Sequence, residues 1–216
     1  MKLGVIAYKI IGRIDRKLVF PIMASSRTKK LKHTDFTVIS NNCWGGVCYE
    51  FFGMPKKTPT VGAYFYAEDF VKMCKDLKRY MSLELEIIPA SESKHIESLR
   101  AKGEQTVLVG RLGDVEIIFL HYHEADELLA KWKRRVERIN WDRVILKFSY
   151  QNECCDEYVR EFLSIDEYPK FCLVGEKITG HKDEIVFSRA NGKETVDETD
   201  NFGCILSPVS ILNDRM

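Results

Sequence analysis

The sequence lacks the features that mark several common classes of protein. No apolar run approaches the roughly 20 residues needed to span a bilayer, and Lys9 interrupts the short apolar stretch where a secretory signal would lie. The seven cysteines include no Cys-x-x-Cys pair, so a zinc site is not expected. The formal net charge of only +1 gives no argument for binding nucleic acid. These absences predict a cytoplasmic protein with free thiols.

Short motifs of several enzyme classes are also missing. The chain contains no His-Glu-x-x-His, no Gly-x-Ser-x-Gly and no Asp-x-Asp of the kind that carries a metal and a sugar nucleotide in many glycosyltransferases. Residues 175–182 approximate a phosphate-binding loop, but His181 stands where that loop requires Lys, and a strand-like run follows. Classical hydrolases and metal-dependent transferases are therefore disfavoured. No metal site is predicted, and any cofactor is left unidentified.

Charge is unevenly distributed along the 216 residues. Residues 1–32 contain nine Lys or Arg and one acidic residue, Asp15, so the rest of the chain is mildly acidic. Apolar positions in this stretch approximate a helical stripe, which Pro21 is expected to interrupt. We expect a basic N-terminal arm at residues 1–33, an α/β domain at 34–190 and a C-terminal tail at 191–216 that shows no clear period.

From residue 36 onward, apolar runs alternate with amphipathic segments, which is typical of an α/β domain. Strands are predicted at residues 36–40, 60–65, 83–88, 106–111, 115–121, 143–148, 171–174 and 184–187. Helices are predicted at residues 44–52, 68–81, 124–139 and 154–163. The pair Gly113-Asp114 indicates a hairpin between two of the strands. The predicted fold is α/β, with a mixed, mostly parallel sheet carrying helices on both faces, plus the basic N-terminal arm.

The first candidate site is the turn between the strand at 36–40 and the helix that follows it. This turn consists of Ser40, Asn41, Asn42, Cys43, Trp44, Gly45 and Gly46. Ligands of open α/β sheets bind outside the carboxyl ends of the strands, where a helix N-terminus favours an anion. Adjacent glycines let the backbone approach a ligand closely, and Cys43 in this place could act as a thiolate nucleophile. In the alternative, structural interpretation, the Ser and Asn side chains cap the helix and Trp44 packs beneath the sheet.

The second candidate lies at the end of the predicted strand at 115–121. This strand is apolar on both faces, so it is expected to be central in the sheet. His121 and His123 share one face and precede a helix, at the edge where active sites tend to lie. His121 is predicted to serve as a general base or to bind a substrate oxygen. One alternative is that His121 caps a helix or packs in the core, bonded to the backbone. Another is that His121 and His123 hold a metal ion with Glu124 or Asp126.

The third candidate is the cationic side of the predicted helix at 124–139. Arg135 falls beside the buried stripe of this helix, where a guanidinium needs a carboxylate or phosphate partner. Together with Arg138, it is predicted to clamp an anion near the edge of the sheet. The alternative is an internal salt bridge, for which Asp142 is a candidate partner.

These motifs occur together and in one order. The turn at 40–46, residues 58–62 (Thr-Pro-Thr-Val-Gly), residues 119–122 (Phe-Leu-His-Tyr) and residues 132–140 (Trp-x-x-Arg-x-x-Arg-Ile-Asn) resemble a bacterial family known as a domain of unknown function. Members of that family are often labelled exopolysaccharide biosynthesis proteins. The resemblance covers most of the chain between residues 36 and 174, and it implies a role in making surface or capsular glycan.

The sequence therefore predicts a protein of exopolysaccharide or surface-glycan biosynthesis that acts as a transferase on a phosphate-bearing sugar or nucleotide-sugar ligand. The turn at 40–46 would hold the ligand, Arg135 and Arg138 would neutralise phosphate, and His121 would accept the proton of an attacking hydroxyl. The alternative is a non-catalytic accessory or binding subunit of a polysaccharide assembly system. Residues 1–32 would make peripheral contact with an anionic membrane or with a partner, or else form a solvated helix packed on the domain. No nucleic-acid partner is predicted.

Overall fold

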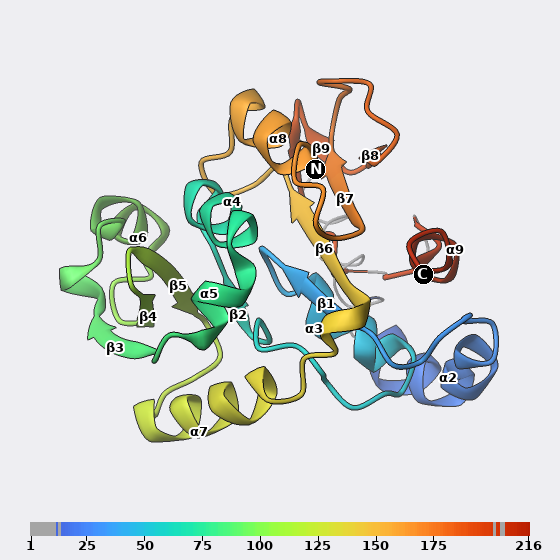
Figure 1. The fold of residues 1–216 in the computed structure, drawn as a ribbon, viewed down its shortest axis with the longest axis horizontal. Helices are drawn as coiled ribbons and strands as arrows, with labels where there is room; N and C mark the ends of the chain where they lie inside the picture. Colours follow the sequence, from blue (N-terminus) through green and yellow to red (C-terminus); the bar gives the residue numbers. More distant parts are fainter. Residues whose placement is uncertain (1–11, 13, 201, 204–205) are drawn as a thin grey trace.

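The structure, a computed structural model, describes residue 12 and residues 14–200, 202–203 and 206–216. Residues 1–11 and 13 of the predicted basic arm lie outside the described residues. The α/β class is confirmed, because helices alternate with the strands of two four-stranded sheets (Figure 1). The strands divide into one parallel and one antiparallel sheet rather than joining in a single mixed sheet.

The parallel sheet contains, in spatial order, β1 (Thr37–Ser40), β6 (Val144–Ser149), β7 (Lys170–Val174) and β8 (Glu184–Val186). Ser40 pairs in register with Lys147, and Ser149 pairs with Leu173. Because these strands run in the same direction, their carboxyl ends lie at one edge of the sheet. The predicted turn at 40–46 and the residues that follow β6 therefore meet at that edge.

The antiparallel sheet contains, in spatial order, β2 (Ala63–Tyr64), β5 (Val115–Phe119), β4 (Leu108–Leu112) and β3 (Glu86–Pro89). The predicted hairpin is present between β4 and β5, and Gly113 at its turn has a φ of +62°, which glycine adopts readily. A hairpin closes a short loop, so these strands pair with each other at a lower entropic cost than with the distant parallel strands. β5 is buried along its length and lies between two strands, as its composition predicted.

Each predicted helix is present with small changes at its ends. These helices are α3 (Trp44–Phe51), α4 (Ala67–Lys75), α5 (Leu77–Ser82), α7 (Ala125–Val136) and α8 (Asp156–Leu163), with the predicted 68–81 helix divided at Asp76. Elements that the sequence did not indicate are α2 (Phe20–Thr28), α6 (Ile96–Lys102), α9 (Pro208–Asn213), the 3-10 turns η2 (Ala90–Glu92) and η3 (Trp141–Arg143), and the ribbon of β9 (Ala190–Asn191) with β10 (Glu194–Thr195).

The N-terminal helical stretch continues through Pro21, contrary to the expected interruption. A π-helical turn, η1 (Asp15–Val19), leads directly into α2, and Pro21 lies in the first turn of α2. Proline is tolerated in a first turn, because the N–H that it lacks has no partner within the helix there. Among the helices of the described residues, none combines the length and the apolar character that crossing a bilayer requires.

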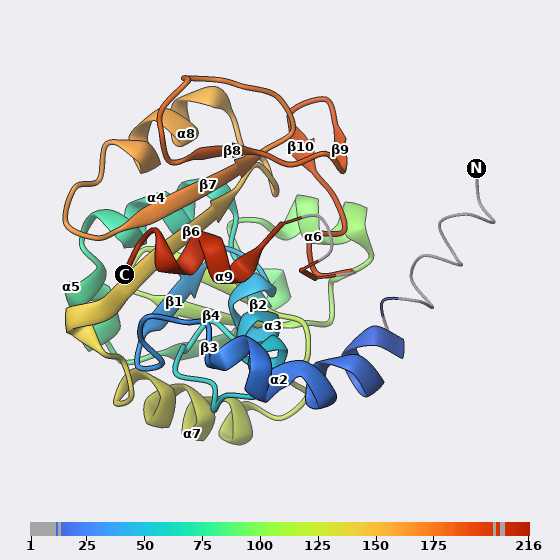
Figure 2. The ribbon, with the colours of Figure 1, turned by 90° about the vertical axis from the view of Figure 1, so that its right-hand side faces the viewer.

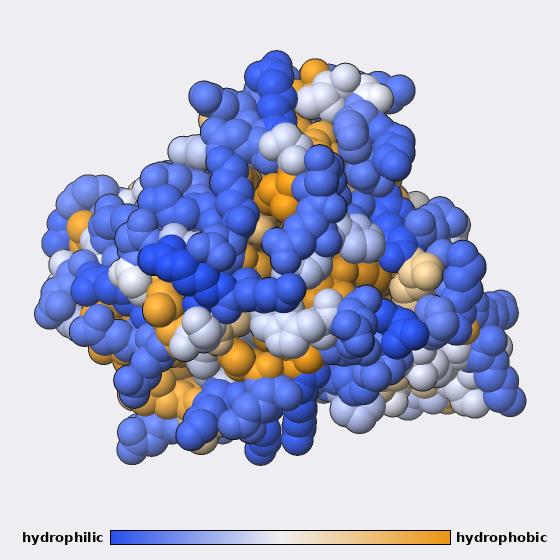
Figure 3. Space-filling model, in the orientation of Figure 1, coloured by the Kyte–Doolittle hydropathy of each residue, from blue (hydrophilic) through white to orange (hydrophobic). Residues whose placement is uncertain are grey.

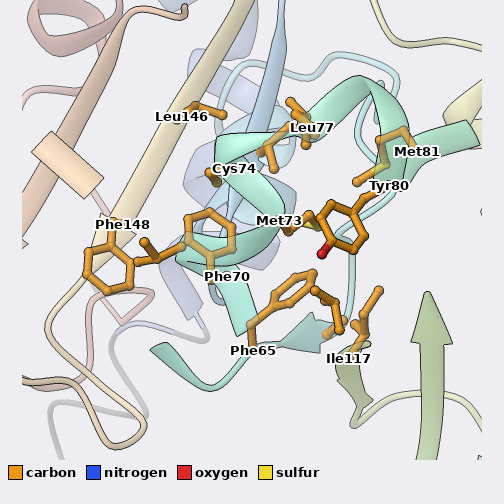
Figure 4. Packing of buried hydrophobic residues seen from close by; sticks show 14 of the residues in the cluster. Phe65, Phe70, Met73, Cys74, Leu77, Tyr80, Met81, Ile117, Leu146 and Phe148 are labelled. Atoms are coloured by element: carbon orange, nitrogen blue, oxygen red, sulfur yellow. The ribbon is translucent and has the colours of Figure 1, made fainter. Parts of the chain in front are cut away.

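Helices α4 and α5 lie between the two sheets and fill the largest apolar cluster (Figure 4). The ring of Phe70 in α4 stacks on Phe148 of β6 with centroids 5.8 Å apart, while Ile117 of β5 belongs to the same cluster. Removing such a buried ring leaves a cavity, so a Phe70→Ala change is expected to cost about 3–5 kcal/mol. The cluster fixes the antiparallel sheet against the parallel one.

The other face of the parallel sheet is covered by α2, α3 and α9 (Figure 2). The indole of Trp44 in α3 packs on Phe171 of β7 and on Phe202, with centroids 5.3 and 5.0 Å apart. Leu212 of α9 is fully buried in the same cluster. The parallel sheet thus carries helices on both faces, as predicted, and the unassigned C-terminal tail supplies part of the core.

Candidate functional site

The turn between β1 and α3 lies at the carboxyl edge of the parallel sheet, where the sequence places it. Asn42 and Cys43 are half-buried, whereas the other residues of the turn, Ser40, Asn41, Trp44, Gly45 and Gly46, are buried. A Cβ at Gly45 would lie 3.3 Å from the carbonyl oxygen of Val38, so this glycine lets α3 pack closely on β1. The backbone at Gly45 therefore approaches β1 closely, whereas the sequence predicted that it would approach a ligand.

Asn41 joins the ends of β1 and β6. Its Nδ2 donates to the carbonyl oxygen of Ser149 at 3.0 Å, and its Oδ1 accepts from the N–H of Ser149, also at 3.0 Å. The side-chain amide thereby continues the backbone ladder where the two strands separate. Both polar atoms of Asn41 are engaged in holding the edge of the sheet together.

A buried ion pair lies directly behind Asn42. The Nζ of Lys147 donates to a carboxylate oxygen of Glu198, and both side chains are almost fully excluded from solvent. The same ammonium donates to Oδ1 of Asn42 at 3.0 Å and to Oγ of Ser149. The other Glu198 oxygen accepts from Oγ1 of Thr195 at 2.5 Å. The pair ties β6 to the segment that follows β10.

Each partner of this pair depends on the other for its charge. Burial lowers the pKa of Lys147, and the Glu198 carboxylate opposes that effect. Burial acts to raise the pKa of Glu198, but the Lys147 charge and the hydrogen bonds to the carboxylate outweigh it and hold this pKa below its ordinary value. Removing one partner would leave an uncompensated buried charge.

Between this edge and the antiparallel sheet is a hollow of about 390 Å³, which we call the polar hollow. Its walls include Asn42 with Gln151, whose side chains are joined by a 2.8 Å hydrogen bond from Nδ2 to Oε1. They also include Tyr64, which donates to Glu104 at 2.6 Å, and Lys102, whose Nζ lies 4.8 Å from the centroid of the Tyr64 ring. Amide, carboxylate and ammonium groups thus surround the space.

A second hollow, of about 290 Å³, is lined by cations from three separate elements, and we call it the basic hollow. Arg16 comes from η1, Lys56 from the loop after α3 and Lys131 from α7, while His121 forms part of the wall after β5. Cys43 and Thr199 line both hollows. The two hollows therefore adjoin at the carboxyl edge of the parallel sheet, and we call them together the groove.

The basic hollow carries more positive than negative charge. Arg16 and Lys56 both pair with Glu50, so two cations share one carboxylate. Burial acts to raise the pKa of Glu50, but these two cations outweigh it and hold the pKa below its ordinary value. Lys131 pairs with Glu127 on its own helix, outside the wall of the hollow. An anion that enters the hollow meets a favourable potential.

Arg135 lies behind the wall of the basic hollow. Its Nη1 donates to the Tyr122 hydroxyl, which in turn donates to the carbonyl oxygen of Val61 at 3.2 Å, and Tyr122 lines the hollow. Within the described part of the chain, no ion pair joins Arg135 to Asp142 or to another carboxylate. The half-buried guanidinium therefore adds positive charge to this end of the groove.

The backbone around the polar hollow adopts unusual conformations. Asn152, Glu153 and Asp197 have φ values of +54°, +62° and +51°, and in the described residues positive φ outside glycine occurs at these three positions. Asn152 and Asp197 line the polar hollow. Such conformations cost about 1–3 kcal/mol each and cluster at functional sites, where the surrounding structure holds them. Here Lys102 donates to Oδ1 of Asn152 at 3.0 Å, and Arg189 donates to Asp197 at 3.0 Å.

The groove lies within a region shared with known proteins. Residues 14–209 match the model of a family described as Domain of unknown function (DUF1919). The chain belongs to this family. A relative from Haemophilus influenzae (strain ATCC 51907 / DSM 11121 / KW20 / Rd), described as an uncharacterized protein, is 26% identical over 207 residues, which cover 89% of this chain and 94% of the relative. The expected membership in a family of unknown function is confirmed, while the exopolysaccharide label and the significance of the turn motif stay predictions.

The predicted site residues of this DUF1919 chain fall into two groups. Those that line the groove are Asn42, Cys43, Gly46 and His121. Beneath the groove lie Ser40, Asn41, Trp44 and Gly45, which are buried, while Arg135 reaches the basic hollow through Tyr122. Arg138 is exposed and belongs to the lining of neither hollow. Part of the structural interpretation also holds, because Trp44 packs in the core and its backbone N–H donates to Oδ1 of Asn42 at 3.1 Å.

Burial raises the pKa of the Cys43 thiol, although the charges of Arg16 and Lys147 act in the opposite direction. This is the reverse of the lowered pKa on which a thiolate nucleophile depends. In the part of the chain that the structure describes, no three His, Cys, Asp or Glu side chains are grouped so that they could hold a metal ion. The groups that the groove offers to a ligand are its cations, amides and carboxylates and the imidazole of His121.

Sequence reasoning missed several residues of the groove. Lys147 carries a signal that could have identified it, because a charged residue inside a strand buried on both faces needs a buried partner. Gln151 and Asn152 follow β6 in the same way that Asn41 and Asn42 follow β1. Ligands bind outside the carboxyl ends of such strands, so the polar residues after β6 could have been predicted as well. Glu198 lies in a segment without periodicity and offered no such signal.

A further buried cluster lies outside the groove. Asp69 of α4 is fully buried and accepts hydrogen bonds from Lys94 and from Nε2 of His95, the latter at 2.6 Å. The His95 ring stacks on Tyr66 with centroids 3.8 Å apart. These contacts fix the start of α4 to the residues that precede α6.

Proposed function

We propose that the groove binds a phosphate-bearing sugar precursor and that the protein transfers its sugar to an acceptor hydroxyl, as a step in exopolysaccharide or surface-glycan biosynthesis. The observation that carries this proposal is that the basic and polar hollows adjoin, with Cys43 and Thr199 in the walls of both. A sugar phosphate or nucleotide sugar has the same two parts, an anionic end and a neutral end rich in hydroxyl groups. The family label implied by the sequence motifs agrees with such a ligand.

The phosphate is assigned to the basic hollow. Lys131 and Lys56 supply ammonium groups at its wall, and Arg16 supplies a guanidinium that can bind phosphate through two parallel hydrogen bonds. Arg135 adds charge from behind through the Tyr122 hydroxyl. Removing one charged hydrogen bond to a phosphate costs about 1.5–3 kcal/mol, which is enough to measure in a binding titration.

The sugar is assigned to the polar hollow. Gln151, which Asn42 holds in place, presents an amide N–H, and Glu104 and Asp197 present carboxylates that accept hydrogen bonds from sugar hydroxyls. The hollow of about 390 Å³ is within the range of small-molecule sites, which is roughly 300–1,000 Å³. Tyr64 offers an aromatic ring beside these groups.

His121 is assigned as the general base, because its exposed imidazole lines the basic hollow and histidine is the commonest general base in enzymes. In this step the acceptor hydroxyl gives its proton to His121 while the hydroxyl oxygen forms a bond to the sugar carbon. The bond between that carbon and the phosphate oxygen breaks, and the released phosphate keeps the bonding electrons and stays beside Lys131. Replacing a general base lowers kcat by about 10²–10⁴-fold.

The test is a thermal-shift screen of the full chain with nucleotide sugars, nucleoside diphosphates and inorganic phosphate, with and without Mg²⁺. We expect the phosphate-bearing ligands to raise Tm in the wild-type protein and to raise it less in Arg135→Ala. The matched control is Lys133→Gln, an exposed cation on the same helix that lies outside the lining of both hollows. A flat response across the panel contradicts the proposal.

A non-catalytic binding subunit is the second candidate. It is favoured by the way the polar groups behind the groove satisfy one another, as in the Lys147–Glu198 pair and the Asn41 bridge. An assay of nucleotide release from a bound nucleotide sugar, in the presence of acceptor glycans, distinguishes the transferase from the binding subunit. Binding without release in wild-type protein favours the accessory subunit, whereas release that His121→Gln abolishes favours the transferase.

A further inference from the structure

The helical stretch formed by η1 and α2 carries an exposed apolar face. Seven large apolar side chains of the described residues are exposed, and five of them lie within ten positions of one another: Ile14 (51% exposed), Leu18 (60%), Val19 (38%), Ile22 (78%) and Met23 (42%). The other two, Val186 and Val196, are far away in sequence. Scattered exposed apolar residues are normal, but a cluster of this kind marks an interaction surface.

This face is not needed to attach the helical stretch to the protein, because the opposite face already does so. Phe20 is buried against Phe51 of α3 with ring centroids 5.2 Å apart, and the guanidinium of Arg27 lies 3.8 Å from the centroid of the same ring. Oγ1 of Thr28 donates to the carbonyl oxygen of Phe52 at 2.7 Å. The outward apolar side chains therefore remain available to another surface.

Positive charge accompanies the apolar face. Between residues 14 and 32 the chain has six basic residues and one acidic residue, Asp15, and the exposed members of the basic set are Lys17, Lys29, Lys30 and Lys32. The last turn of α7 adds exposed Lys133 and Arg134. Both α2 and α7 lie along the lower side of the molecule in two perpendicular views (Figures 1 and 2). An occupant that contacts this helical stretch is expected to combine apolar material with negative charge.

We propose that the face formed by Ile14, Leu18, Val19, Ile22 and Met23 docks on a lipid bilayer that contains anionic lipids. A helical segment that exposes apolar side chains beside lysines lies in the plane of the interface, with the apolar side chains in the acyl boundary and the lysines among the headgroups. Lysines near an anionic bilayer add electrostatic attraction that salt weakens. A second copy of the chain is a poorer occupant, because it would bring the basic residues of two identical faces together.

Docking in this way would hold the groove at the membrane surface. Arg16 belongs to η1, the same segment that carries Leu18 and Val19, and it lines the basic hollow. A phosphate that belongs to a membrane lipid could therefore reach the basic hollow from the bilayer. If the proposed function holds, the substrate class is a sugar linked to a lipid through phosphate. The lipid would stay in the bilayer while the phosphate lies in the groove.

The test is co-sedimentation of the full chain with phosphatidylcholine vesicles, with and without phosphatidylglycerol. We expect binding to the anionic vesicles, weaker binding to the neutral ones, and loss of binding at high salt. The variant Leu18→Gln/Ile22→Gln should lower the partition coefficient about ten-fold or more, because two apolar side chains no longer enter the bilayer. The matched control is Val186→Gln/Val196→Gln, which changes the same number of exposed apolar side chains elsewhere and should bind as wild type does.

Two outcomes would overturn the inference. In the first, the Leu18→Gln/Ile22→Gln variant and the wild-type protein pellet equally with anionic vesicles. In the second, the wild-type chain is a dimer in solution that this variant converts to a monomer, which would assign the face to a second copy. Soluble nucleotide-sugar binding by the same variant tests the proposed function separately, and we expect it to be unchanged because neither residue lines the groove.

Discussion

Lys147 and Glu198 form a buried ion pair although 51 positions separate them in the chain. Lys147 belongs to β6, and Gln151 and Asn152, which follow that strand, line the polar hollow, as Glu198 itself does. Asn42 contacts both, with its Oδ1 3.0 Å from Nζ of Lys147 and its Nδ2 3.0 Å from the carboxylate of Glu198. The pair therefore shapes the polar hollow without offering either charge to a ligand.

Breaking this pair from one side should destabilise the protein strongly. We expect Lys147→Met, which leaves the Glu198 carboxylate buried without its partner, to lower the free energy of unfolding by about 3–5 kcal/mol. The double variant Lys147→Met/Glu198→Leu should recover most of that loss, because apolar side chains replace both charges. Urea unfolding followed by circular dichroism measures both effects. Equal destabilisation in the single and double variants would contradict this account.

The same pair predicts how stability depends on acid. The pKa of Glu198 is held below its ordinary value in the folded protein, so the unfolded chain binds a proton at this position more readily. Its contribution to stability is present above the unfolded-state pKa of about 4.3 and is lost as pH falls through the folded-state pKa. The free energy of unfolding of the wild-type protein should fall more steeply below that pH than that of Lys147→Met/Glu198→Leu. Parallel pH profiles for the two proteins would argue against the assignment.

The position of the turn at 40–46 was largely predictable, because local signals determine it. The apolar run before Ser40, the small residues after it and the hairpin at Gly113 each concern neighbours in the chain, and each prediction is confirmed. The division into two sheets depends on which distant strands pair, and residue patterns do not encode that choice. α9 is short and is held by the core rather than by its own propensity, so the sequence of the tail did not reveal it.

Cys43 should react slowly with alkylating reagents, despite its place in the groove. Burial raises the pKa of its thiol, so at neutral pH the thiolate fraction is smaller than in a free cysteine. Cys155 is exposed and serves as the internal comparison. Iodoacetamide at pH 7 should modify Cys155 first, and labelling of Cys43 should increase only as pH rises well above 7. Mass spectrometry of peptides from a time course would reveal the order, and earlier labelling of Cys43 would revive the thiolate hypothesis.

The apolar side chains along α7 mark a third hollow that differs from the groove. This hollow, of about 390 Å³, lies between α7 and the chain that joins α5 to β3, and its walls include Leu85, Leu129 and Trp132. Figure 3 shows apolar surface gathered at the lower left, around α7. Cations concentrate instead at the basic hollow, which Lys131 of the same helix lines. A phosphate is therefore expected in the basic hollow.

The most direct test of the central claim is a calorimetric titration of inorganic pyrophosphate into the wild-type chain, Lys131→Gln and Lys133→Gln. Both variants remove one cation from α7, but only Lys131 lines the basic hollow. We expect Lys131→Gln to weaken binding by roughly ten-fold or more, the effect of losing one charged hydrogen bond, and Lys133→Gln to match the wild-type protein. Equal affinities in all three proteins, or no binding to the wild-type chain, would contradict the assignment of the basic hollow as a phosphate site.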